Sequence, residues 1–306
     1  MGIELGTKAT HRQISSPVPL AASRRTLHGF SLVELMMATA IFSLLVVILA
    51  SVAQNVGNAW VYSQGRTARR QSARAIIDFI TRDIQNALSP IVPSSTNNLQ
   101  FIRNPATLTA DNYQSGHTLF WQAPVSSNPG HADVAILGYF VRWSANHKAS
   151  LCRLYITMAN PGEYLINSAP ANWINDTVVE TRAPATPQSN YLGLMAENVV
   201  GFWAEPLDSY GKVITQPSKD FDSRAGYTDS QGRSHAIGSL PAAVRISIAT
   251  LDPRSATRLS TSLQQMANDA ENAEAFVAAV RADPSLKAIH QGIYSYTSSV
   301  GLLNSR

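Results

Sequence analysis

The segment Phe30–Ala53 reads FSLVELMMATAIFSLLVVILASVA. From Leu35 to Ala53 no residue is charged, and a helix of these nineteen residues would span about 29 Å, close to the thickness of a bilayer core. A cleaved secretory signal has a shorter apolar region, and a buried core helix rarely stays uncharged for so long. The segment therefore predicts a membrane-inserted helix. Its expected transmembrane side chains include Leu35, Ile41, Leu44, Val47 and Leu49.

The composition around this segment is that of a folded protein. The chain has 306 residues, 45% hydrophobic and 14% charged, which excludes a disordered tail, a collagen and a long coiled coil. Its single cysteine, Cys152, excludes an intramolecular disulfide and a cysteine zinc site. The net charge is +4. Residues 1–29 carry +3 of it, because they contain the four cations Lys8, Arg12, Arg24 and Arg25 and the single anion Glu4. The remainder is nearly neutral, so a basic surface for nucleic acid is not implied.

Glu34 is a carboxylate near the start of the apolar helix. A charged group in lipid is costly and marks a functional site by default. The alternative is a carboxylate at the membrane interface, facing the positive end of the helix dipole. The residue alone leaves both interpretations open.

The string Gly29-Phe30-Ser31-Leu32-Val33-Glu34, followed by an apolar run, resembles the cleavage and methylation signal of type IV prepilins and pseudopilins. The resemblance implies that a membrane prepilin peptidase cuts between Gly29 and Phe30 and that Phe30 is N-methylated. It also implies that Glu34 meets the amino terminus of a neighbouring subunit and sets the register of assembly. A polar pair that fixes register is an attested use of buried charge.

The membrane orientation follows from this resemblance and not from charge. Four basic residues precede the apolar segment, and four follow it (Arg66, Arg69, Arg70 and Arg74), so the positive-inside rule gives nearly a tie. The resemblance implies a cytoplasmic leader of residues 1–29, a single span of residues 30–54 in a bacterial inner membrane, and a periplasmic carboxy-terminal domain. The four arginines are expected to contact solvent or lipid phosphates. The alternative of DNA contact lacks interleaved aromatic residues.

The helix is predicted to continue through residues 55–90, because no proline lies between Pro19 and Pro90. Its second half carries an apolar stripe at three- and four-residue steps, expected to pack against a soluble domain. The stripe comprises Ala73, Ile76, Ile77, Ile80, Ile84, Ala87 and Leu88.

Residues 91–306 show period-two patterns and short connections, which predict an antiparallel sheet and an α+β fold overall. A helix over 255–282, ending at Asp283-Pro284, should interrupt the last hairpin. Gln216–Leu240 is polar and predicts a long surface loop, and Asp208–Gly211 predicts a turn. The expected strands are Leu99–Arg103, Thr118–Gln122, Val134–Trp143, Leu151–Thr157, Val199–Glu205, Lys212–Thr215, Val244–Thr250 and Ile293–Val300.

Several later segments extend the resemblance in order: Leu137–Val141, Leu154-Tyr155, Ala196–Phe202 and Leu240–Ile246. They are similar to the minor pseudopilin J branch of type II secretion and to the Verru_Chthon cassette protein C class. Either branch implies a long helix against an antiparallel sheet. The J branch also implies a place in a tip complex with other minor and major pseudopilins, built on an inner-membrane assembly platform.

No catalytic motif stands in the sequence, and the expectation is a structural protein rather than an enzyme. Cys152 has the setting of a small buried hydrophobe, and His117 and His131 are expected on the surface. Asp220, Asp222 and Asp229 suggest calcium, but Arg224 occupies the place of a third ligand, so no cofactor is expected. The strand tryptophans Trp121, Trp143 and Trp203 are expected in the core.

The sequence therefore predicts a membrane-anchored minor pseudopilin-like subunit of a secretion or pilus-like fibre. The alternative is a DNA-uptake or adhesion pilin whose head binds an external ligand.

Overall fold

The computed structural model describes residues 31–90, 99–110, 113, 115–128, 131–144, 148–183, 193–216 and 220–304. The side chains of residues 58–69, 126–128, 131 and 132 lie outside that description. The chain divides into two units, Met1–Gln64 and Gly65–Arg306.

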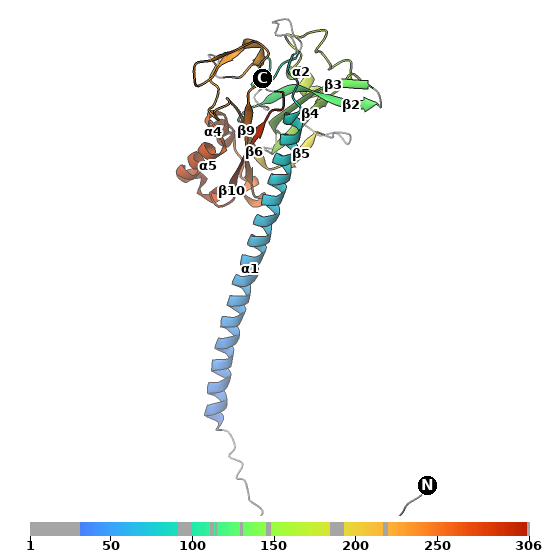
Figure 1. The fold of residues 1–306 in the computed structure, drawn as a ribbon. Helices are drawn as coiled ribbons and strands as arrows, with labels where there is room; N and C mark the ends of the chain where they lie inside the picture. The colour runs from blue at the N-terminus through green and yellow to red at the C-terminus, as the bar shows by residue number, and fades with distance from the viewer. Residues whose placement is uncertain are drawn as a thin grey trace, which may run out of the picture. The chain divides into compact units, whose positions relative to one another are not determined.

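The described part of the chain starts with one long helix, and strands and short helices follow (Figure 1). The helices are α1 (Leu32–Gln85), α2 (Asp176–Arg182), η2 (Ser223–Ala225), α3 (Pro253–Ala256), α4 (Thr261–Asp269), α5 (Ala273–Ala282) and η3 (Pro284–Ile289). The strands are β1 (Ile102–Arg103), β2 (Leu119–Asn128), β3 (His131–Trp143), β4 (Ala149–Ile156), β5 (Leu194–Glu197), β6 (Val199–Leu207), β7 (Tyr227–Thr228), β8 (Ser234–His235), β9 (Ala243–Leu251) and β10 (Ile293–Gly301).

The first unit contains the apolar part of α1. Leu32–Gly57 has a mean hydropathy of 2.6 and is long and apolar enough to cross a membrane. Its hydroxyl groups bond to carbonyl oxygens of the helix itself, for example Thr39 Oγ1 to Met36 O at 3.0 Å and Ser43 Oγ to Thr39 O at 2.7 Å. Such internal bonds leave these polar groups satisfied in an apolar environment.

The second unit is built on antiparallel sheets, as the sequence predicts. One has the order β1-β2-β3-β4-β5, another β10-β9-β6, and β7 and β8 form a two-stranded ribbon. The chain passes between the two larger sheets at Asn198, whose φ of 61° lies in the left-handed region. Its N–H donates to Ala149 O in β4 and its C=O accepts from Leu251 N in β9, so one residue joins both sheets.

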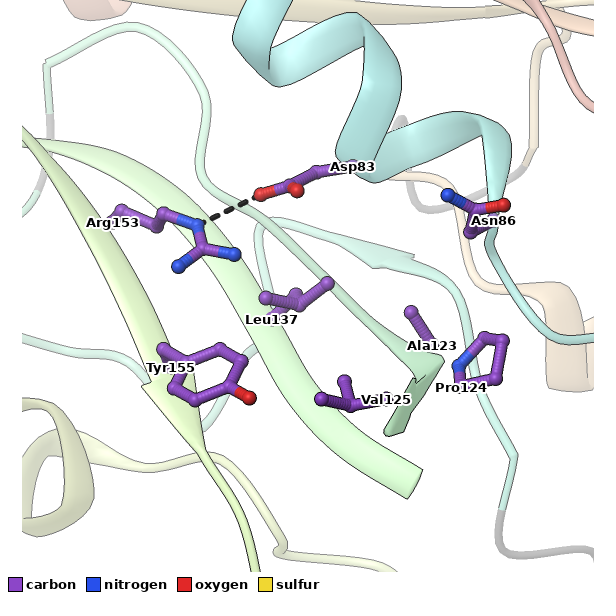
Figure 2. A pocket seen from close by; sticks show the side chains of 8 residues that line it. All are labelled: Asp83, Asn86, Ala123, Pro124, Val125, Leu137, Arg153 and Tyr155. Carbon is purple, nitrogen blue, oxygen red and sulfur yellow. Dashed lines mark hydrogen bonds and ion pairs between the residues drawn. The ribbon is translucent and has the colours of Figure 1, made fainter. Parts of the chain in front are cut away.

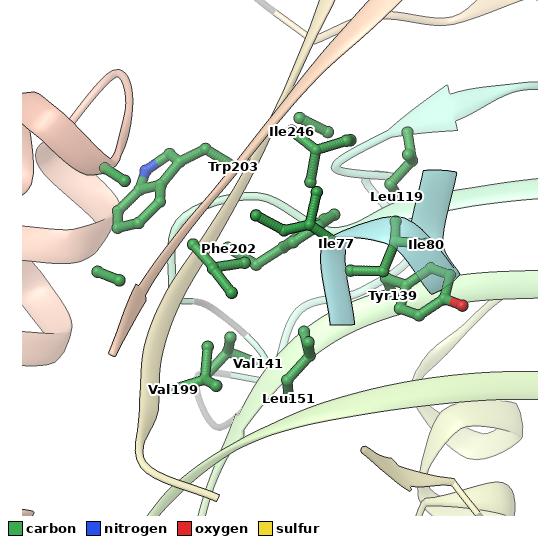
Figure 3. Close-up of a cluster of buried hydrophobic side chains, with 14 of the residues drawn as sticks. Ile77, Ile80, Leu119, Tyr139, Val141, Leu151, Val199, Phe202, Trp203 and Ile246 are labelled. Carbon is green, nitrogen blue, oxygen red and sulfur yellow. The ribbon is translucent and has the colours of Figure 1, made fainter. Parts of the chain in front are cut away.

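The apolar stripe at the carboxy-terminal end of α1 lies where the two larger sheets meet. Figure 3 shows Ile77 and Ile80 between side chains of β6 and β9 and side chains of β2, β3 and β4. Ile80 is completely buried, and Ile77 is 4% exposed. Ala73, Ile77, Ile80, Ile84 and Ala87 of the predicted stripe are core, and Ile76 and Leu88 are partly buried. The predicted tryptophans Trp121, Trp143 and Trp203 are also buried. The prediction that the helix continues to residue 90 is wrong, because α1 ends at Gln85.

The expected single helix over 255–282 is wrong, because the structure has α3, α4 and α5 there. Ser260 and Ala270 are extended, and the side chain of Asn272 accepts hydrogen bonds from Glu274 N and Ala275 N, which starts a new helix. Trp203 Nε1 in β6 donates to Ala270 O at 2.9 Å and holds the break in place. Figure 1 shows α4 and α5 beside the sheet that contains β6, β9 and β10. The predicted end before Asp283-Pro284 and the interrupted β9–β10 hairpin are confirmed.

Gln216–Leu240 does not form the surface loop that the sequence predicts. Phe221 and Leu240 are 1% exposed, and the segment contributes η2, β7 and β8. Its polar residues form a local scaffold: Gln216 Oε1 accepts from Asp222 N at 2.7 Å. The sequence predicts a surface loop because most residues of the segment are polar, and the few buried apolar side chains, such as Phe221 and Leu240, do not change that composition.

The remaining differences concern strand limits. Lys212–Thr215 is not a strand, although Leu207 and Val213 form one isolated bridge after the predicted turn. Of the predicted strand Leu99–Arg103, only Ile102–Arg103 pairs with another strand. The strand β2 continues to Asn128, beyond the predicted end at Gln122. The sequence reading missed α2 and β5, which are short and weakly patterned.

Candidate functional site

Only the part of the amino-terminal signal that begins at Ser31 lies within the described residues. Gly29 and Phe30 lie outside the described residues. Glu34 is in the first turn of α1 and is exposed, and Leu35 N donates to Ser31 O at 3.1 Å as the helix begins. A carboxylate in this turn faces the positive end of the helix dipole and has room to meet a cation from another chain.

The apolar side chains that follow are exposed on the chain taken by itself. The exposed fractions of Leu35, Ile41, Leu44, Val47 and Leu49 lie between 57% and 65%. A continuous apolar surface of this kind is rare in soluble monomers and marks contact with lipid or with other protein surfaces. Small residues such as Ala38 and Ala50 interrupt it and would allow close helix approach.

The arginine cluster is described only in part. The side chains of Arg66 and Arg69 lie outside the described set, whereas Arg70 and Arg74 are exposed on α1. Two exposed cations are compatible with a solvated face or with contact to phosphates.

A hydrogen-bonded ion pair ties the end of α1 to the five-stranded sheet. Asp83 Oδ2 accepts from Arg153 Nε at 2.7 Å and from the Tyr139 hydroxyl at 2.6 Å. Burial raises the pKa of the Tyr139 hydroxyl, and the Asp83 charge raises it further. Burial lowers the pKa of the Arg153 guanidinium, but the hydrogen bond and charge of Asp83 outweigh it and leave that pKa raised. The sequence reading missed Arg153, although it is the one charged residue within β4.

The three aspartates considered for calcium serve separate protein contacts. Asp220 accepts from Asn104 Nδ2, Asp222 caps η2, and Asp229 pairs with Arg233 Nε at 2.8 Å. Burial would raise the pKa of Asp229, but hydrogen bonds from Arg233, His235 and Gln231 outweigh it and lower the pKa to about 2. Within the described residues, no three His, Cys, Asp or Glu side chains gather into a group able to hold a metal.

The expectation of a surface position is wrong for His117, which is half-buried. Its Nδ1 lies 3.1 Å from both the backbone nitrogen and the backbone oxygen of Ala204. Burial, followed by the charge of Arg103, lowers the pKa of His117 to about 3, against the hydrogen bond to Ala204. A neutral, fixed imidazole of this kind supports β6. The His131 side chain lies outside the described set, and Cys152 is buried in β4 as expected.

A comparison with protein families finds the prokaryotic N-terminal methylation motif at residues 24–50. No curated protein matches the chain. The motif indicates a type IV pilin-like or pseudopilin subunit, a structural class of protein. It implies processing by a prepilin peptidase and assembly with other pilin-like subunits, and the single apolar helix is compatible with single-pass membrane anchoring.

Proposed function

We propose that the chain is the precursor of a minor pseudopilin-like subunit. Prepilin peptidase cuts between Gly29 and Phe30, Phe30 becomes N-methylated, and the mature chain enters a secretion or pilus-like fibre. The observation that carries the proposal is the position of Glu34, which lies within the methylation motif of residues 24–50 and in the first turn of an exposed apolar helix.

The proposed mechanism is assembly. Leu32–Gly57 first holds the chain in the inner membrane, with residues 1–29 in the cytoplasm and the sheet domain in the periplasm. The same apolar surface then packs among other subunit helices, because lipid and a helical bundle are both apolar surroundings. Glu34 pairs with the amino terminus of a neighbouring subunit and fixes the stagger between the two helices.

The sheet domain gives the subunit its place among other subunits. Its antiparallel sheets, packed against the end of a long helix, support the interpretation of a minor subunit of the J branch or of the Verru_Chthon cassette class, whereas the short helices near the carboxy terminus depart from the J pattern. In this proposal the domain recognises other minor subunits near the fibre tip, whereas the alternative is a head that binds an external ligand.

The decisive experiment is mass spectrometry of the mature amino terminus, in cells with and without prepilin peptidase. The expected result is a chain that starts at N-methylated Phe30 only when the peptidase is present. An intact leader in both strains, or a cut at another position, would contradict the proposal. A Glu34→Ala variant should still be produced and folded, so it separates processing from assembly.

A further inference from the structure

A surface pocket lies between the end of α1 and the strands β2, β3 and β4 (Figure 2). Its volume is about 320 Å³, at the lower end of the range found for small binding pockets. The sheet supplies an apolar floor, and Asp83, Arg153 and Tyr155 supply polar groups on one side. The remaining lining residues are Asn86, Ala123, Pro124, Val125 and Leu137.

Arg153 and Asp83 use only part of their hydrogen-bonding capacity on each other. Arg153 donates through Nε to Asp83 and also shares a hydrogen bond with the Tyr139 hydroxyl, which together use two of the five N–H donors of a guanidinium. Figure 2 shows the two terminal nitrogens of Arg153 on the side of Leu137 and Tyr155, away from the bonded carboxylate oxygen. Asp83 likewise accepts twice through Oδ2 and makes no bond through Oδ1 within the described part of the chain. The pocket therefore offers the remaining guanidinium N–H groups of Arg153 beside the second carboxylate oxygen of Asp83.

Exposed aromatic rings flank the guanidinium. The Arg153 Cζ atom lies 5.3 Å from the ring centroid of Phe79 and 5.0 Å from that of Tyr155. These rings remain 44% and 40% exposed, although each is large and apolar. Arginine near two aromatic rings, beside an apolar depression, has the composition of the anchor points that dominate protein–protein interfaces.

We propose that this pocket binds a segment of a neighbouring protein subunit, which inserts one large aliphatic or aromatic side chain and bonds through its backbone. The peptide C=O accepts from the terminal nitrogens of Arg153, and the peptide N–H donates to Asp83 Oδ1. The charges of Arg153 and Asp83 balance, which favours a neutral peptide group over a free anion. This inference rests on the proposed function, because it assigns a contact within the proposed assembly.

The test is site-specific photocrosslinking in cells that contain the proposed assembly. The full chain carries p-benzoylphenylalanine in place of Tyr155, which keeps an aromatic ring beside Arg153. The matched control carries it in place of Tyr210, which is 51% exposed on a turn of the same domain. The expected product joins position 155, and not position 210, to a chain that has its own glycine–aromatic–glutamate signal. Products with lipid alone, equal products at both positions, or no product would overturn the inference.

Two pocket variants test the chemistry of the contact. Arg153→Gln removes the guanidinium donors, and Val125→Trp fills the pocket from β2 without touching the ion pair. Each should reduce the crosslinked fraction at least fivefold, while protease resistance of the sheet domain reports folding. Unchanged crosslinking in folded Val125→Trp would overturn the inference even if Arg153→Gln fails to fold.

Amino-terminal mass spectrometry of the same cells separates the two proposals. A chain processed at Phe30 that gives no crosslink at position 155 contradicts only the pocket. An unprocessed chain contradicts the proposed function itself.

Discussion

Two stretches of one helix, Leu32–Gly57 and Ala73–Gln85, have opposite surroundings. In the first, large apolar side chains such as Leu44 are more than half exposed on the chain by itself. In the second, Ile80 and Ile84 are completely buried against the sheets of the second unit. The backbone is helical in both, so secondary structure alone does not distinguish them.

The difference lies in where the apolar residues stand around the helix. The second stretch confines its isoleucines to a stripe and places Asp78, Arg74 and Arg82 elsewhere, so one face can enter a protein core. The first stretch is apolar all round, which suits lipid or a bundle of helices. The second stretch is stabilised by its own domain, whereas the first depends on surroundings that the chain does not supply.

The largest expected effect separates these two sources of stability. Ile80→Ala should lower the free energy of unfolding of the sheet domain by about 2–5 kcal/mol, because it leaves a cavity where the sheets meet. Leu44→Ala should leave it unchanged. The measurement is denaturant unfolding of the full chain in detergent, followed by tryptophan fluorescence. Equal effects of the two substitutions would contradict the distinction between the stretches.

The next effect concerns assembly without folding. Glu34→Ala should reduce incorporation into fibres at least tenfold, about 1.4 kcal/mol, because the amino terminus of the neighbouring subunit loses its counter-charge. Sedimentation of sheared fibres measures incorporation, and the unfolding midpoint of the sheet domain should not change. Normal assembly of Glu34→Ala would remove the proposed role of this residue.

A smaller effect is expected from acid, and only in the second unit. Burial would raise the pKa of Asp208, but hydrogen bonds from Ser230, Lys212 and Tyr210 outweigh it and lower the pKa to about 2, as for Asp229. A depressed carboxyl pKa contributes stability above its unfolded value near 3.9, and that stability is lost as the pH falls toward 2. Glu205 works in the opposite direction, because burial raises its pKa against the charges of Arg245 and Arg103.

Unfolding of the full chain at pH 5 and pH 3 tests this expectation. The tryptophan-detected transition should weaken at the lower pH, while the helix signal in detergent that remains after the sheet domain unfolds should persist. Asp229→Asn should reduce the pH dependence in this window. An unchanged pH dependence in Asp229→Asn would show that other carboxylates carry it.

The smallest effect is expected on DNA binding, from the arginine cluster that lies in the sequence between the two stretches. Replacing Arg66, Arg69 and Arg70 with Ala should change retention of double-stranded DNA by the full chain less than about twofold, because no aromatic residues accompany the arginines. Electrophoretic mobility at two salt concentrations measures the retention. A tenfold loss that diminishes at high salt would instead favour the DNA-uptake alternative.

Much of the fold is readable from the sequence where a pattern is continuous. The uncharged run after Glu34, the stripe through Ile80 and the alternation in Val244–Thr250 each correspond to a helix or strand of the structure. The break between α4 and α5 was not predicted, because Leu263, Met266 and Phe276 keep nearly helical spacing across it. A side-chain cap from Asn272 and a hydrogen bond from Trp203 in a distant strand override that periodicity.

The candidate site divides in the same way. The signal around Glu34 is a local motif and could be recognised from the sequence alone. The pocket depends on Asp83 and Arg153, which are 70 residues apart and meet only because α1 packs on β4. Likewise, the burial of His117 depends on Ala204, 87 residues away. Neither relationship has a local sequence pattern.

The buried position of Cys152 has a consequence for how the protein matures. Its side chain lies in the core of a chain with no second cysteine, at 1% exposure. The native state therefore requires no thiol oxidation, and the folded domain presents no accessible sulfur for mixed-disulfide exchange. The sheet domain is consequently able to reach the same structure under reducing or oxidising conditions, so its folding does not depend on the redox machinery of the compartment that receives it.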